Sequence, residues 1–179
     1  TGVLAPGFIG TTIFYHQDYM AALNGWPPQL FATSLVVLSS TTVVVALITG
    51  WVIDRYGAVS VLPFFLVPLS ASCLVLSLNG PPFVLYVVMV FLGTAYGASS
   101  TLFGSLWPGI FGTVYLGSIR AVTVSAVVIA TAAGPGLTGT LIDQGITLPR
   151  QMFYLAIYCL AATVAMGVAA VFLRRRAAG

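Results

Sequence analysis

Few side chains in this sequence could take part in chemistry, and two of them are adjacent. Asp54 and Arg55 lie in the stretch Gly50-Trp51-Val52-Ile53-Asp54-Arg55-Tyr56-Gly57, between two long runs that are almost free of charge. Desolvating a charge in hydrocarbon is expensive, so a charged turn between apolar runs predicts a tight connection at a membrane surface. An acid at the C-terminal end of a helix is unfavourable without a partner. We expect Asp54 to pair with Arg120, which begins a later apolar run; the alternative is a solvated turn whose arginines only set topology.

The composition predicts helices that cross a bilayer. Of 179 residues, 59% are hydrophobic and only 5% are charged, whereas a soluble domain carries about 25% charged residues. A helix needs about 20 apolar residues to cross a hydrocarbon core about 30 Å thick. The apolar runs are continuous, unlike the alternating strands of a β-barrel. We therefore expect an all-α membrane protein, with residues 1–179 in a single bundle. The six expected spans are Leu4–Ala22, Leu30–Ile53, Val59–Leu78, Phe83–Leu106, Ile119–Ile142 and Met152–Leu173.

The arginines predict the orientation of this bundle, because the chain contains no lysine. Arg55, Arg120 and the run Arg174–Arg176 follow the second, fourth and last expected spans, and only Arg150 lies on the other side. The positive-inside rule places the side with five of the six arginines in the cytoplasm. Both termini are therefore expected on the cytoplasmic side of the plasma membrane. The net charge of +3 is interpreted as a topological signal and not as a nucleic-acid-binding surface.

The turn that contains Asp54 carries a family resemblance. Gly50-x-x-x-Asp54-Arg55-x-Gly57, between a second and a third span, resembles the signature loop of the major facilitator superfamily, Gly-x-x-x-Asp-Arg-x-Gly-Arg-Arg. Ala58 and Val59 stand where that signature has its last two arginines. In the superfamily the full signature belongs to the N-terminal six-helix half and a degenerate copy to the C-terminal half. The resemblance therefore implies a C-terminal half whose N-terminal partner half is missing, and the apolar start at Thr1 leads us to expect further sequence upstream.

Other stretches are similar to prokaryotic monocarboxylate and oxalate/formate-type members of the superfamily. They are Phe14-Tyr15-His16-Gln17 with Asn24-Gly25-Trp26, Tyr115-Leu116-Gly117-Ser118-Ile119-Arg120, and Gly134-Pro135-Gly136 with Leu141-Ile142-Asp143. This similarity implies a small organic anion, such as a monocarboxylate, as the transported solute. No arginine or lysine lies at mid-depth in the spans to pair with a carboxylate. Either the missing half supplies the charge or the solute is neutral.

The resemblance also selects a substrate pathway, because the first and fourth helices of each facilitator half line the central cavity. The candidate residues are Thr12, His16, Gln17 and Tyr19 on the first helix, and Tyr86, Met89, Gly93, Tyr96 and Ser100 on the fourth. His16 is the only histidine, and histidine is the side chain that ordinarily changes charge between about pH 5 and 8. Contact with substrate or with protons is one interpretation of His16. A satisfied interior group or an interfacial anchor is the other.

Gly134-Pro135-Gly136 interrupts the fifth expected span. Proline removes one backbone hydrogen bond, and the flanking glycines add conformational freedom. Two interpretations stay open for this triplet, a static kink and a flexing gate.

An enzyme is not expected. One histidine, three aspartates and no glutamate cannot supply a metal site or a catalytic carboxylate pair at useful spacing. The sequence has no glycine-rich phosphate loop, so it predicts neither ATP drive nor a cofactor. We expect gradient-driven transport of a small solute by alternating access. A non-transporting six-helix scaffold or assembly factor is the alternative, and it would not need the Asp54-Arg55 turn.

Overall fold

The computed structural model describes the backbone of residues 2–178 and the side chains as far as Leu173. This part of the chain is all helical and contains no strand, which confirms the all-α prediction. The helices are α1 (Ala5–Tyr15), α2 (Gln17–Asn24), α3 (Gln29–Tyr56), α4 (Ala58–Val61), α5 (Val67–Ser77), α6 (Phe83–Phe111), α7 (Leu116–Asp143) and α8 (Leu148–Ala178). Among the described residues, α3, α6, α7 and α8 are long and apolar enough to cross a membrane.

Two of the six expected spans are interrupted. The first is divided into α1 and α2 at His16, whose backbone angles of φ −99° and ψ 24° leave the helical range. The third consists of the short α4, a run of turns over residues 62–66, and α5. Pro63 lies within this run and Pro68 in the first turn of α5, and neither can donate the backbone hydrogen bond that a continuous helix requires. Six uninterrupted spans are therefore not observed within residues 2–178, where four helices reach spanning length.

The fourth span is longer than expected. The loop predicted to begin at Trp107 is helical as far as Phe111, so α6 contains Pro108. The helix ends where Gly112 adopts φ +71° and its N–H donates to the Pro108 carbonyl oxygen, 3.0 Å away. Glycine adopts this positive φ without a steric penalty.

Close contact between α3 and α6 depends on two glycines. A Cβ atom at Gly93 would lie 2.7 Å from the carbonyl oxygen of Leu38, and one at Gly97 would lie 2.5 Å from that of Thr42. Small residues at such positions let helix backbones approach where lipid gives no hydrophobic drive for association. This contact makes α6 the centre of the bundle, and half of its most apolar window is buried inside the structure.

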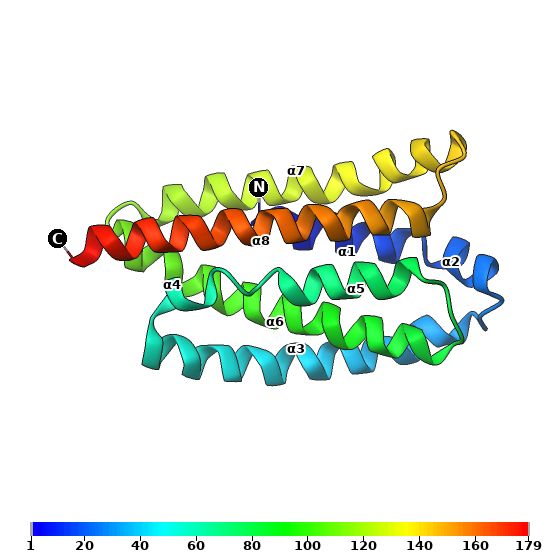
Figure 1. Ribbon diagram of the computed structural model, residues 1–179, viewed down its shortest axis with the longest axis horizontal. Helices are drawn as coiled ribbons and strands as arrows, with labels where there is room; N and C mark the ends of the chain where they lie inside the picture. The colour runs from blue at the N-terminus through cyan, green and yellow to red at the C-terminus, as the bar shows by residue number, and fades with distance from the viewer. Residues whose placement is uncertain (1, 179) are drawn as a thin grey trace.

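The helices run roughly side by side, so that the connections gather at two ends (Figure 1). The α3–α4 and α6–α7 connections share one end with the C-terminus, and the α2–α3, α5–α6 and α7–α8 connections lie at the other. Arg55 and Arg120 therefore belong to the same end, as the topology prediction requires. The side chains of Arg174, Arg175 and Arg176 lie outside the described residues.

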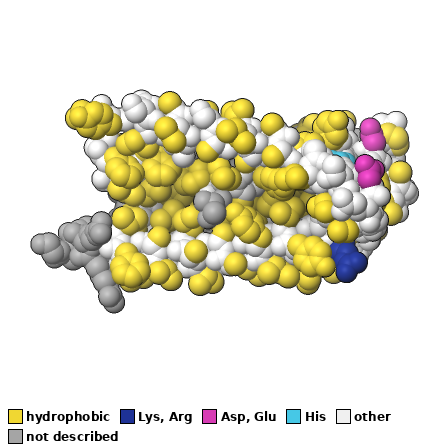
Figure 2. Space-filling model, turned by 90° about the horizontal axis from the view of Figure 1, so that it is seen from above, with side chains coloured by type: hydrophobic (Ala, Val, Ile, Leu, Met, Phe, Trp, Pro, Cys, Tyr) yellow, Lys and Arg dark blue, Asp and Glu magenta, His cyan; other side chains and the backbone are white. Residues whose placement is uncertain are grey.

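The outer surface suits a hydrocarbon environment. Hydrophobic side chains cover the length of the face shown in Figure 2, and its coloured charged and histidine side chains gather at one end. None of the most apolar window of α7 is buried inside the structure. Buried apolar area stabilises a helix in water, so an apolar helix that remains uncovered needs lipid or protein around it. The described chain therefore has the surface of an integral membrane protein.

Candidate functional site

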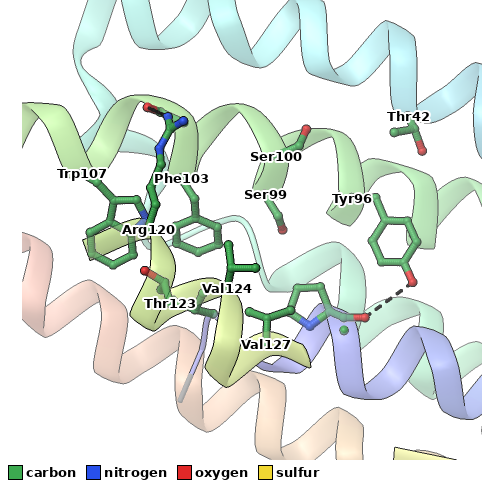
Figure 3. A pocket seen from close by; sticks show the side chains of 14 residues that line it. Thr42, Tyr96, Ser99, Ser100, Phe103, Trp107, Arg120, Thr123, Val124 and Val127 are labelled. Atoms are coloured by element: carbon green, nitrogen blue, oxygen red, sulfur yellow. Dashed lines mark hydrogen bonds between the residues drawn. The ribbon is translucent and has the colours of Figure 1, made fainter. Parts of the chain in front are cut away.

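A cleft of about 620 Å³ lies where α1, α3, α6 and α7 meet (Figure 3). The first turn of α1 contributes Pro6 and Gly7, and α3 contributes Thr42. Val3, just before α1, also lines the cleft, and the other lining residues come from α6, between Tyr96 and Trp107, and from the first half of α7, beginning at Arg120. Pockets of about 300–1,000 Å³ commonly hold small molecules. The volume of this cleft is therefore sufficient for a small solute.

The stripe predicted on α6 is divided between the cleft and the protein interior. Tyr96 and Ser100 line the cleft. Met89 is fully buried in the core, and Gly93 lies against the backbone of α3. Tyr86 is hydrogen-bonded through its hydroxyl to the Thr33 hydroxyl, 2.9 Å away. Only the part of the stripe nearer the C-terminal end of α6 therefore reaches the cleft.

The residues predicted on the first helix do not line the cleft. Thr12 is fully buried, and its hydroxyl oxygen lies 3.5 Å from that of Thr138 in α7. His16 lies at the break between α1 and α2, with its Nδ1 atom 3.1 Å from the Thr12 carbonyl oxygen. Gln17 and Tyr19 follow in α2 and are half-buried. These four residues belong to the α1–α7 contact and to the end of the bundle beyond it.

The Asp54–Arg120 ion pair expected from the sequence is not formed among the described residues. Asp54 is exposed at the end of α3, and the guanidinium of Arg55 lies 5.8 Å from the ring centroid of Tyr56. Gly57 ends α3 with φ +81°. Upstream, Gly50 lies in α3 facing α6, where a Cβ atom would be 3.8 Å from the Thr101 methyl group. In this conformation the signature-like turn is therefore a solvated helix end.

Arg120 instead contacts the backbone of α6. Pro108 has no N–H, so the Gly104 carbonyl oxygen four residues earlier lacks its usual helical donor. Nη2 of Arg120 donates to that oxygen at 3.3 Å. This contact supplies a donor to the carbonyl oxygen that Pro108 leaves without its helical partner.

Gly134, Pro135 and Gly136 do not interrupt α7, which remains helical to Asp143. Gly134 lies close against α1, because a Cβ atom there would be 2.7 Å from the Phe8 carbonyl oxygen. Gly136 has open space around its Cα, with no atom within 4 Å of an added Cβ. The two glycines that flank Pro135 therefore have different surroundings.

Sequence reasoning missed the aromatic wall of the cleft. Phe103 and Trp107 are stacked with ring centroids 5.9 Å apart and an interplanar angle of 17°. Phe65 meets Phe103 edge-on at 5.2 Å, and Trp107 also approaches Phe111 at 6.3 Å. The four-residue spacing of the three α6 aromatics places them on one helical face, which was the available signal. No comparable pattern in the sequence indicated the other polar lining residues, Thr42, Ser99 and Thr123.

Comparison with known proteins identifies no relative. The chain matches no protein-family model, no curated protein and no solved structure. Its function is therefore argued from the cleft and from the surfaces around it.

Proposed function

We propose that this chain is one six-helix half of a secondary transporter of the major facilitator type, which moves a small solute across the cytoplasmic membrane by alternating access. The observation that supports this proposal most is the cleft. It combines hydroxyl groups and Arg120 with apolar walls, in a chain with only 5% charged residues. Polar groups within a membrane bundle are costly and commonly mark a solute path.

A second bundle is the proposed partner of the α7 surface. Gly117, Ala121, Ser125 and Ala132 are exposed in α7, and their spacings of four and seven residues place them on one side of the helix. Small residues permit close approach by another helix. In alternating access, two halves rock around a solute held between them. We propose that the missing N-terminal half packs here and covers the cleft.

The proposal is tested by solute uptake into liposomes. We expect the 179-residue chain alone to give no uptake, because one bundle cannot alternate around a shared site. The full-length protein that contains both halves is expected to concentrate its solute when an ion gradient is applied. Robust uptake by the isolated chain as a monomer would contradict the two-bundle mechanism.

The alternative function is a non-transporting membrane scaffold, for which the exposed apolar α7 is the favouring observation. Substitutions in the cleft discriminate between the two functions. A scaffold should keep its partner when Ser99 or Tyr96 is altered, whereas a transporter should lose solute uptake while its assembly remains intact.

A further inference from the structure

We propose that the end of the cleft formed by Arg120 and Trp107 binds the anionic group of a solute that has a planar, apolar body, such as an aromatic carboxylate. This inference rests on the proposed function, because it assigns a solute class to the proposed path. It is carried by the distribution of hydrogen-bond donors, charges and aromatic rings around the cleft.

Hydroxyl groups in the middle of the cleft use their protons locally. Ser99 donates to the Ala95 carbonyl oxygen at 2.6 Å, and Ser100 donates to that of Gly97 at 3.0 Å. Thr42 donates to the Leu38 carbonyl oxygen at 2.8 Å. A hydroxyl that donates to its own helix offers a solute only its oxygen lone pairs. The middle of the cleft is therefore poor in donors for an anion.

Hydrogen-bond donors are concentrated at the end of the cleft formed by Arg120 and Trp107. Arg120 carries five guanidinium N–H groups, and its one hydrogen bond among the described residues is the 3.3 Å contact with Gly104. The indole N–H of Trp107 makes no hydrogen bond within the described part of the chain, and Figure 3 shows the Trp107 side chain beside that of Arg120. No residue of the lining is acidic. This end therefore has the charge and the free donors that an anion requires.

The contact with Gly104 leaves Arg120 available. The acceptor is a neutral carbonyl oxygen, the distance is at the long end of the range, and the side chain is exposed. Hydrogen bonds between guanidinium and carboxylate are shorter and stronger, and they are often bidentate. One N–H group can remain on the Gly104 oxygen while others bind the anion. Solute binding would then occur directly at the junction of α6 and α7.

The walls next to this end fit a planar body. Phe103 and Trp107 present stacked rings on one side, and Val124 and Val127 of α7 line the same cleft. Aromatic rings prefer offset-stacked or edge-on partners. A benzoate-sized carboxylate can therefore place its ring on the aromatic wall while its carboxylate contacts Arg120 and the Trp107 indole.

The test is fluorine NMR of the chain in lipid nanodiscs, with 4-fluorobenzoate as the probe. The matched probes 4-fluorobenzyl alcohol and 4-fluorobenzylamine have the same ring and carry a neutral or a positive group. After subtraction of the signal from empty nanodiscs, we expect saturable line broadening for the benzoate alone. Arg120→Gln should weaken benzoate binding about tenfold or more, because a charge-assisted hydrogen bond is lost. Trp107→Phe, which keeps a ring but removes the N–H, should weaken it about threefold.

Matched variants control for net charge and for folding. Arg150→Gln removes the same charge at the opposite end of the bundle, and Trp51→Phe changes an exposed tryptophan outside the cleft; both should bind benzoate as the unaltered chain does. Arg120→Lys keeps the charge without the planar guanidinium, and its affinity for benzoate should lie within severalfold of that of the unaltered chain.

Equal broadening by all three probes, or equal affinity of Arg120→Gln and Arg150→Gln for benzoate, would overturn the inference. Uptake of a neutral solute by a full-length protein that binds no benzoate would overturn it while leaving the proposed function standing. Benzoate binding without any uptake would support the anion site and count against transport.

Discussion

The hydroxyl of Thr11 in α1 lies 3.0 Å from the carbonyl oxygen of Thr131 in α7, to which it donates a hydrogen bond. Thr131 lies four residues before Pro135, which has no N–H to donate to that oxygen. The same hydroxyl also lies 2.8 Å from the Gly7 carbonyl oxygen and 3.2 Å from that of Phe8, both in its own helix. Those oxygens have regular donors within α1, whereas the Thr131 oxygen does not. A cross-helix side chain therefore satisfies the backbone group that the proline leaves free, as Arg120 does for Gly104 and Pro108.

This relationship predicts a coupled effect on stability. Thr11→Val keeps the side-chain shape but leaves the Thr131 oxygen without a partner, and should cost about 1–3 kcal/mol in the free energy of unfolding. In a Pro135→Ala background the backbone N–H at position 135 is restored, so Thr11→Val should cost less. Unfolding in mixed detergent micelles measures all four members of this double-mutant cycle.

Thr94→Val provides the control, because the Thr94 hydroxyl donates only to the Val90 carbonyl oxygen of its own helix. It should change the free energy of unfolding by less than about 0.5 kcal/mol. Additivity of Thr11→Val and Pro135→Ala would show that the cross-helix bond does not depend on the proline.

The two glycines beside Pro135 give a second prediction. Gly134→Ala would place a methyl group 2.7 Å from the Phe8 carbonyl oxygen and 2.9 Å from the Thr12 hydroxyl. The helices must then separate, at a cost of about 1–3 kcal/mol. Gly136→Ala meets no atom within 4 Å and should stabilise α7 by up to about 1 kcal/mol through helix propensity. Thermal unfolding distinguishes the two variants.

The uptake rate of the Gly136→Ala variant tests whether Gly134-Pro135-Gly136 acts as a gate. If this triplet produces only a static kink in α7, Gly136→Ala should leave the uptake rate of the full-length protein unchanged. A large fall in rate for this stable variant would indicate that bending at Pro135 belongs to the transport cycle.

The helices could largely be predicted from the sequence, because long apolar runs determine where they lie. The two interruptions, at His16 and between α4 and α5, were not equally predictable. Pro63 and Pro68 indicate the turns before α5, but nothing in the residue types around His16 indicates the end of α1. Pro108 was misleading, because it indicated a loop where α6 continues to Phe111. At this proline a tertiary contact, the donation from Arg120 to the Gly104 carbonyl oxygen, replaces the missing helical donor, and local sequence does not contain that contact.

The cleft could be predicted only in part, because it depends on which helices meet. The family resemblance and the spacing along α6 selected Tyr96 and Ser100, which line the cleft, but they could not show that Met89 and Gly93 face the core and α3. Arg120 was expected to form an ion pair with Asp54 at the membrane surface. The structure places it in the lining of the cleft, since the end of α6 and the start of α7 lie against each other. Sequence alone could therefore name the charged residue but not its surroundings.

A third prediction concerns Asp54. Its carboxylate is exposed and has no ion pair among the described residues, so Asp54→Asn should change the free energy of unfolding by less than about 0.5 kcal/mol. Arg55→Gln is the neighbouring control and should behave alike. A loss above about 1 kcal/mol would show that Asp54 is paired in the folded protein. Unchanged stability with a transport rate lowered more than twofold would place the pairing in another conformation of the cycle.

The last prediction concerns His16 and proton coupling. The Thr12 carbonyl oxygen can only accept, so Nδ1 of His16, 3.1 Å away, must carry the hydrogen of this contact. Protonation adds a second hydrogen at Nε2 and keeps the first. The contact at the α1–α2 break therefore needs only the hydrogen on Nδ1 and leaves Nε2 free to accept or to donate.

We expect the dependence of the uptake rate of the full-length protein on pH to involve the His16 side chain, the one imidazole in the sequence. His16→Gln keeps a hydrogen-bond donor without a titrating group, so it should flatten this profile while leaving thermal unfolding unchanged. Asp18→Asn, two residues along at the exposed side of α2, controls for a change of local charge and should retain the profile. Identical profiles for the unaltered protein and His16→Gln would make His16 a structural residue of the α1–α2 break, and proton coupling would then have to reside in the partner half.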